Sequence, residues 1–166
     1  MMPCYPGEMQ LALPIPDGWE VRSFENGRRV VIVPPLPPGG VPDLVVDIDP
    51  LVPAPDEPRV WIATAMARDA PAGATVQTLS AQPGTAQVGW PMELVHARIV
   101  DAAGALVEIR LGGFYKLNEW GGHALVRATS QERFVAARAQ LTEILVGARP
   151  IWKSRDEVTC LADLWA

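Results

Sequence analysis

ELVHARIVDAAGALVEIRL, residues 93–111, has the pattern of a β-hairpin. Apolar and polar side chains alternate through both halves, as in strands with one buried face; the apolar set is Val95, Ala97, Ile99, Val107, Ile109 and Leu111. Both halves bury the same face if odd residues pair with odd residues, which a loop over residues 102–104 allows. Gly104 would then adopt a left-handed conformation, and Arg98 would face Glu108 across the strands.

Similar patterns elsewhere predict further strands and two helices. The hairpin strands are expected to extend to Gln87–Val100 and Ala105–Tyr115, and the other strands are expected at Met9–Leu13, Arg28–Val33, Leu44–Asp49, Thr75–Ala81 and Gly122–Thr129. Asp56 would cap a helix over Arg59–Asp69, and Ser130 would cap a second helix that ends at Gly147. Strands that follow one another along the chain pair antiparallel, so the sequence predicts an α+β fold.

The composition favours one soluble domain. A chain of 166 residues with 49% hydrophobic content can bury a core, and a net charge of -5 gives no basic face for nucleic acid. Cys4 and Cys160 lack the spacing of a disulfide scaffold or of a structural zinc site. Met1–Gln10 lacks the pattern of a signal peptide, and no apolar run is long enough to span a membrane. We therefore expect a cytoplasmic protein.

The segment Leu13–Trp19, LPIPDGW, resembles the opening of PsbP/DcrB-like domains, and Trp61-Ile62 and the helix that starts at Phe134 extend the similarity over roughly residues 9 to 150. The resemblance implies a PsbP-like α/β/α sandwich in a family that binds partners and shares no active site. Members without a signal peptide resemble the Eag-type chaperones of type VI secretion, which hold an apolar helix of a secreted effector. The proline loop at 34–42 and the tail depart from that pattern.

The expected organisation is a single domain over residues 1–150 and a C-terminal tail over residues 151–166. Ser154 and Glu157 have the spacing of a capping box. Apolar residues follow at helical intervals, namely Val158, Leu161, Leu164 and Trp165. The tail is therefore predicted to form a short amphipathic helix that docks on its own domain or on a second copy.

No group of residues has the pattern of an active site or a metal site. His96 and His123 are the only histidines, and neither has a carboxylate or cysteine at ligand spacing, so we expect structural roles. Asp43, Asp47 and Asp49 alternate with apolar residues, which predicts a charged edge strand that faces solvent. The sequence thus predicts a protein that is not an enzyme and that holds no metal and no cofactor.

Strand parity predicts an open sheet face opposite Val107, Ile109 and Leu111, provided that the helices cover only one face. Exposed apolar surface of this kind usually marks an interaction site. The predicted partner-binding residues are Trp90, Met92, Leu94, Leu106, Leu125, Arg110 and Arg127. We expect a non-catalytic chaperone or adaptor that binds an apolar helix there. The sequence leaves open a small-molecule or lipid-binding domain, a structural or accessory subunit, a homodimer, and a face covered by the helices or the tail.

Overall fold

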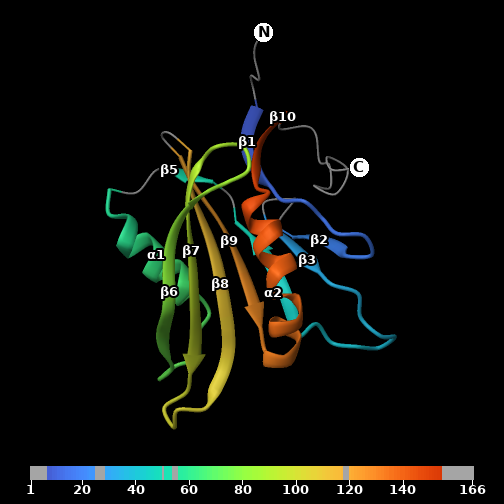
Figure 1. Ribbon diagram of the computed structural model, residues 1–166, viewed down its shortest axis with the longest axis vertical. Helices are drawn as coiled ribbons and strands as arrows, with labels where there is room; N and C mark the ends of the chain where they lie inside the picture. The colour runs from blue at the N-terminus through green and yellow to red at the C-terminus, as the bar shows by residue number, and fades with distance from the viewer. Residues whose placement is uncertain (1–6, 25–28, 50, 54–55, 118–119, 155–166) are drawn as a thin grey trace.

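The computed structural model describes residues 7–24, 29–49, 51–53, 56–117 and 120–154 (Figure 1). The strands are β1 Gly7–Ala12, β2 Glu20–Phe24, β3 Arg29–Val33, β4 Leu44–Ile48, β5 Val52–Pro53, β6 Thr75–Thr85, β7 Pro91–Val100, β8 Leu106–Leu117, β9 Trp120–Ala128 and β10 Arg149–Ser154. The helices are α1 Pro58–Met66 and α2 Gln131–Val146.

An antiparallel sheet of 8 strands forms the centre of the domain, in the order β2-β3-β4-β9-β8-β7-β6, with β5 paired to β9. Strands β1 and β10 form a separate antiparallel pair. Because β6 to β9 pair in chain order and each helix lies against one face, the predicted α+β fold with an antiparallel sheet and flanking helices is confirmed.

Helix α2 covers one sheet face, which we call the α2 face. Four of its side chains are buried there, namely Phe134, Leu141, Ile144 and Leu145. They pack on side chains from β3, β4, β8 and β9, such as Ile32, Val46, Leu111 and Val126. At the end of the helix the Tyr115 hydroxyl donates to the Leu145 carbonyl oxygen at 2.6 Å. Burial raises the pKa of Tyr115 far above its usual value, so this hydroxyl keeps its proton.

Helix α1 covers part of the opposite face, which we call the α1 face. Its apolar contacts form a smaller cluster of Ala65, Met66, Val95, Ala97, Phe114 and Leu125, with Trp61, Ile62 and Val76 packed against it. Charged side chains lie beside this cluster, and Arg110 and Asp47 are almost completely buried, at 0% and 1% exposure. The two faces therefore differ in composition, since the α2 face is mainly apolar.

The central hairpin contains a β-bulge that the sequence analysis missed. Gly104 has φ 85°, as predicted, and Asp101 closes the loop by accepting hydrogen bonds from the backbone N–H groups of Ala103 and Ala105. The register shifts between Ile99 and Val100, so that Arg98 lies opposite Ile109 rather than opposite Glu108. The predicted odd-to-odd pairing is therefore wrong over most of the hairpin, because one extra residue reverses the parity of every later pair.

Strand β4 is an interior strand rather than the predicted edge strand. It lies between β3 and β9, and α1 and the turn that follows it cover its Asp47 side. Asp47 is buried and pairs with Arg68, whose Nη2 lies 3.4 Å from Asp47 Oδ2. The alternation was interpreted correctly, but a face with aspartates was wrongly assigned to solvent. Buried carboxylates are found where a cation pairs with them.

The two helices begin differently. The Ser130 hydroxyl accepts a hydrogen bond from the backbone N–H of Arg133 at 3.2 Å, which confirms the predicted cap of α2. Helix α1 starts after Glu57 without a side-chain cap, so the predicted cap at Asp56 is wrong. Pro58 occupies the first turn of α1, where its missing N–H leaves no intrahelical bond unmade.

The predicted boundary at residue 150 falls within β10, so residues 151–154 of the assigned tail form a strand. The predicted tail helix lies outside the described residues. Within the described ranges, neither helix has the length and hydropathy that a membrane crossing requires.

Candidate functional site: a cleft beside helix α1

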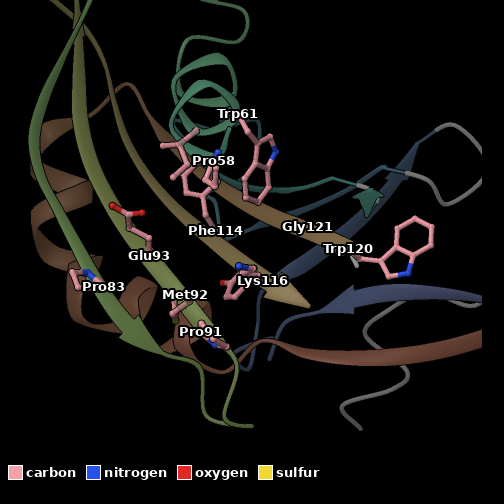
Figure 2. Close-up of a pocket in the computed structure, with 12 residues that line it drawn as sticks. Pro58, Trp61, Pro83, Pro91, Met92, Glu93, Phe114, Lys116, Trp120 and Gly121 are labelled. Carbon is pink, nitrogen blue, oxygen red and sulfur yellow. The ribbon is translucent and has the colours of Figure 1, made fainter. Parts of the chain in front are cut away.

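An apolar cleft of about 220 Å³ opens between α1 and the ends of β6 to β9 (Figure 2). It is lined by Pro58, Trp61, Ile62, Pro83, Pro91, Met92, Glu93, Phe114, Tyr115, Lys116, Trp120 and Gly121. In Figure 2, Pro58 and Trp61 extend from α1 towards Phe114, and Trp120 lies at the far end, with its indole ring directed away from the other labelled residues. Most of the lining is aliphatic or aromatic, so the cleft suits an apolar group.

Aromatic rings give the cleft a rigid wall. Trp61 contacts Phe114 edge to face, with ring centroids 5.2 Å apart and an interplanar angle of 87°. Trp120 is 42% exposed, which is high for so large an apolar side chain. Glu93 and Lys116 are the charged lining residues, and neither forms an ion pair with another described residue. The cleft thus combines anchored rings with an exposed tryptophan and two available charges.

A buried ionic network holds α1 and the turn after it against the sheet. Arg110 Nη1 donates to the Met66 carbonyl oxygen at 2.8 Å, at the end of α1. Arg110 Nε and Arg127 Nε both donate to Glu108 Oε1, at 2.7 and 2.8 Å. Arg110 and Arg127 are direct neighbours on β8 and β9, so Glu108 neutralises two like charges that face each other. Because a cation also suits the negative end of a helix, this network fixes where α1 ends.

The glutamate also favours the charged form of Arg127. Burial alone would lower the pKa of Arg127, but the hydrogen bond and charge of Glu108 and the charges of Asp69 and Asp47 raise it. Asp69 lies in the turn after α1 with φ 58°, a conformation rare for residues other than glycine. Its Oδ2 is 3.5 Å from Arg127 Nη1. The turn is therefore tied to β9 as well as to β8.

A second part of the network joins the α1 turn to β4 and β9. Arg68 pairs with both Asp47 and Asp49, and His123 Nε2 lies 2.6 Å from Asp49 Oδ2. Burial alone would raise the pKa of Asp49, but the hydrogen bonds and charges of His123 and Arg68 outweigh it and lower that pKa. The carboxylate of Asp49 is therefore held in its charged form.

His123 is placed for packing rather than for chemistry at an open site. Its ring stacks on Phe114, with centroids 5.6 Å apart, and meets Trp61 edge to face at 5.9 Å. The residue is 8% exposed, and Nδ1 has no hydrogen-bond partner among the described residues. No group of three histidine, cysteine, aspartate or glutamate side chains within the described ranges could hold a metal ion.

The predicted partner-binding residues divide between the two faces, so their placement on one open face is wrong. Met92 and Leu94 belong to the α2 side, where Trp90 also packs, whereas Arg110, Leu125 and Arg127 lie on the α1 face. The two groups lie on opposite faces because the bulge in the hairpin changes the parity with which β7 pairs with β8. Leu125 is 1% exposed and Arg110 is fully buried, and Leu106 is 40% exposed at the start of β8. Met92 also lines the cleft.

The other histidine also has a structural position. His96 stacks on Phe134 of α2, with centroids 5.4 Å apart and an interplanar angle of 19°. Burial and the charge of Arg138 lower its pKa, which favours the neutral ring. Both histidines therefore contact aromatic side chains that hold a helix on the sheet.

The cleft has no signature in the sequence. Trp61, Phe114 and Trp120 come from a helix and two strands, and no local pattern places them together. A signal for the network did exist, because Arg110 and Arg127 were assigned to one face together with Glu108. Two arginines on adjacent buried strands require a shared carboxylate, and this requirement points to a covered face.

The arrangement of the sheet and the two helices defines a PsbP-like α+β domain. Three solved structures share this fold. Cyanobacterial PsbP (CyanoP) from Synechocystis is 10% identical, the match covers 86% of this chain and 92% of that chain, and the TM-score is 0.60. LpqN of Mycobacterium tuberculosis, which is involved in cell envelope biogenesis, is 14% identical, with 90% of this chain and 86% of that chain covered and a TM-score of 0.55. The Ran-binding protein Mog1p of Saccharomyces cerevisiae is 13% identical, with 84% of this chain and 89% of that chain covered and a TM-score of 0.51. At these identities the likeness shows the fold. No protein-family model and no curated protein matches the sequence significantly.

Proposed function

We propose that this domain is a non-catalytic, cytoplasmic binding module that holds an apolar helical segment of a partner protein in the cleft beside α1. The observation that carries the proposal is the exposed Trp120 at the end of an apolar cleft that Trp61 and Phe114 also line. Tryptophan is enriched among the residues that dominate binding energy at protein interfaces. Met92 is the member of the sequence-predicted set that stays in this proposal, since it lines the cleft.

The size of the cleft favours side chains of a protein partner over a free ligand. Sites for small molecules usually enclose about 300–1,000 Å³, whereas this cleft encloses about 220 Å³. One or two apolar side chains would fill that volume. A helix presents such side chains at positions i and i+3 or i+4, and helix-in-groove recognition uses those anchors. We therefore favour a helical partner over the small-molecule or lipid-binding alternative.

Two resemblances support a binding role. Mog1p of Saccharomyces cerevisiae, whose solved structure shares the fold, is a Ran-binding protein. The sequence resemblance to Eag-type chaperones extends the proposal to a chaperone or adaptor that holds an apolar helix of a type VI secretion effector. The buried ionic network also supports the non-catalytic part, since its charged groups are used to hold α1 on the sheet.

The test is capture of a partner by matched variants. Tagged wild-type protein, Trp120→Ala and Leu106→Ala are used to capture proteins from the cells that express the gene, and the captured proteins are identified by mass spectrometry. Trp120 and Leu106 have similar exposure, 42% and 40%, and Leu106 lies outside the cleft. The apolar helices of the captured protein are then synthesised and titrated against each variant.

We expect Trp120→Ala to weaken binding of the helical peptide at least tenfold, since loss of an interface tryptophan that dominates binding costs about 2 kcal/mol or more. Leu106→Ala should bind as the wild type does, and both variants should keep the wild-type melting temperature. Equal losses in the two variants, or a partner that binds through an extended segment, would contradict the proposal. A bound lipid or small molecule in the purified wild type, absent from Trp120→Ala, would favour the ligand-binding alternative.

A further inference from the structure

Strand β6 forms one outer edge of the sheet (Figure 1). It has 11 residues, Thr75–Thr85, and its side chains are mostly exposed. It pairs with β7 on one side, and no other described strand pairs with its free side. An edge of this kind presents unpaired backbone N–H and C=O groups, which are a template for another strand.

The two edges of the sheet differ in charge. Strand β2, at the opposite edge, contains Glu20 and Arg22, which form an exposed ion pair at 3.2 Å. Charges at an edge discourage a second strand from pairing with it. Strand β6, TVQTLSAQPGT, contains no charged residue, and it is the only described strand longer than two residues of which this is true. The exposed edge at β6 therefore lacks the charged side chains that commonly keep another strand from pairing with an edge.

An exposed apolar residue lies near the middle of β6. Leu79 is 54% exposed and sits at a bulge between Thr78 and Ser80. The bulge and Pro83, which has no N–H to donate, limit how far a continuous ladder could extend along this edge. Residues on both sides of Leu79 can still pair with another strand. Burial of the exposed Leu79 side chain against that strand would be favourable.

We propose that β6 pairs antiparallel with β6 of a second copy of this chain, giving a two-fold symmetric dimer with a continuous sheet. In a two-fold contact each strand must be compatible with itself, and like charges that face each other would destabilise it. The neutral β6 meets that requirement in every register, whereas Glu20 and Arg22 restrict the registers in which β2 could pair with its own copy. Near the symmetry axis the two Leu79 side chains would cover each other. This inference uses no residue of the proposed function except Pro83, which β6 contributes to the cleft wall.

The experiment measures the mass of the full chain by sedimentation velocity over a concentration series up to about 100 μM. We expect a monomer–dimer equilibrium in the wild type. Leu79→Lys should raise the dimer dissociation constant at least tenfold, because it brings two like charges together and removes the apolar contact. Val135→Lys is the matched control, since Val135 is an exposed apolar residue on α2, at 66% exposure, and it should dimerise as the wild type does.

Two further readouts make the assignment specific. Backbone amides of β6 should gain protection from hydrogen exchange at dimer-forming concentrations, and those of β2 should not. Added salt should not weaken the dimer, because the paired strands carry no charge. A monomeric wild type, a dimer that survives Leu79→Lys, or protection confined to β2 would overturn the inference. Binding of a helical peptide to Leu79→Lys at wild-type affinity would show that the cleft works independently of the dimer.

Discussion

The two faces of the sheet are held to their helices in different ways. On the α2 face, buried apolar side chains of α2 interlock with the sheet, and one hydrogen bond from Tyr115 fixes the end of the helix. On the α1 face, a smaller apolar cluster is joined by a network that includes the fully buried Arg110. Apolar packing is tolerant of small shifts, whereas charge-assisted hydrogen bonds fix direction and distance.

This difference has a functional meaning. The cleft lies on the α1 side, where α1 is short and contributes two buried residues, Ala65 and Met66. A short helix with little apolar contact would slide on the sheet, and the cleft would change shape with it. Arg110, Arg68 and Arg127 prevent this by tying the end of α1 and its turn to three strands. We therefore expect the α2 face to set the stability of the fold and the α1 network to set the geometry of the site.

The largest expected effect comes from Arg110→Ala. The change leaves the buried Met66 carbonyl without its donor and Glu108 with a single partner, in a largely buried site. Breaking a buried ionic interaction costs about 3–5 kcal/mol. Denaturant unfolding should show a loss of that size, and capture of the helical partner should fall with it.

Arg98→Ala is the matched control for that change. Arg98 is an exposed arginine of β7 whose Nε donates to Gln77 at 2.8 Å. Its removal should cost less than about 1 kcal/mol. Similar losses for the two arginine variants would mean that the network on the α1 face contributes no more than an exposed contact does.

The parts of the fold that the sequence predicted are those set by local patterns. Alternation identified the strands at β3, β4, β8 and β9, and the Ser130 cap identified the start of α2, because these signals depend on neighbouring residues alone. Strand β10 was missed since it pairs with β1 at the far end of the chain. Nothing near Ile151 in the sequence reports that partner.

The candidate site was beyond local patterns for a related reason. A single bulge beside Ile99 reversed the predicted parity, and so moved Met92 and Leu94 to the face opposite Leu125. Asp47 was assigned to solvent because its cation, Arg68, is 21 residues away in the chain. Local alternation shows which residues share a face of the sheet. Whether that face is buried depends on the helices and turns that pack against it, which local alternation does not show.

A moderate effect on the α2 face is expected from Gly113→Ala. An added Cβ would lie 2.5 Å from the Tyr115 hydroxyl oxygen and 3.3 Å from Leu145, between β8 and α2. Overpacking of this kind costs about 1–3 kcal/mol, and the loss should appear in thermal and denaturant unfolding. Gly84→Ala is the control, since its Cβ would meet only Met92 at 3.9 Å. A Gly113→Ala variant as stable as Gly84→Ala would contradict the close packing of β8 against α2 at this position.

The smallest effect concerns pH and the α1 face. The pKa of Asp49 is lowered in the folded protein from an ordinary value of 3.8, by His123 and Arg68 acting against burial. The unfolded chain therefore binds a proton at this group more readily than the folded chain does, and the free energy of unfolding must fall as pH falls. The stabilisation is fully present above the unfolded pKa and is lost as pH drops through the lowered folded pKa.

Asp49→Asn should accordingly be less stable than the wild type near neutral pH, and the difference should shrink between about pH 5 and about pH 2. Asp17→Asn, at an exposed turn, should give a curve parallel to the wild type. We would measure urea unfolding across this range. A constant difference between Asp49→Asn and the wild type would mean that the ion pairs of Asp49 contribute nothing to the acid sensitivity of the α1 face.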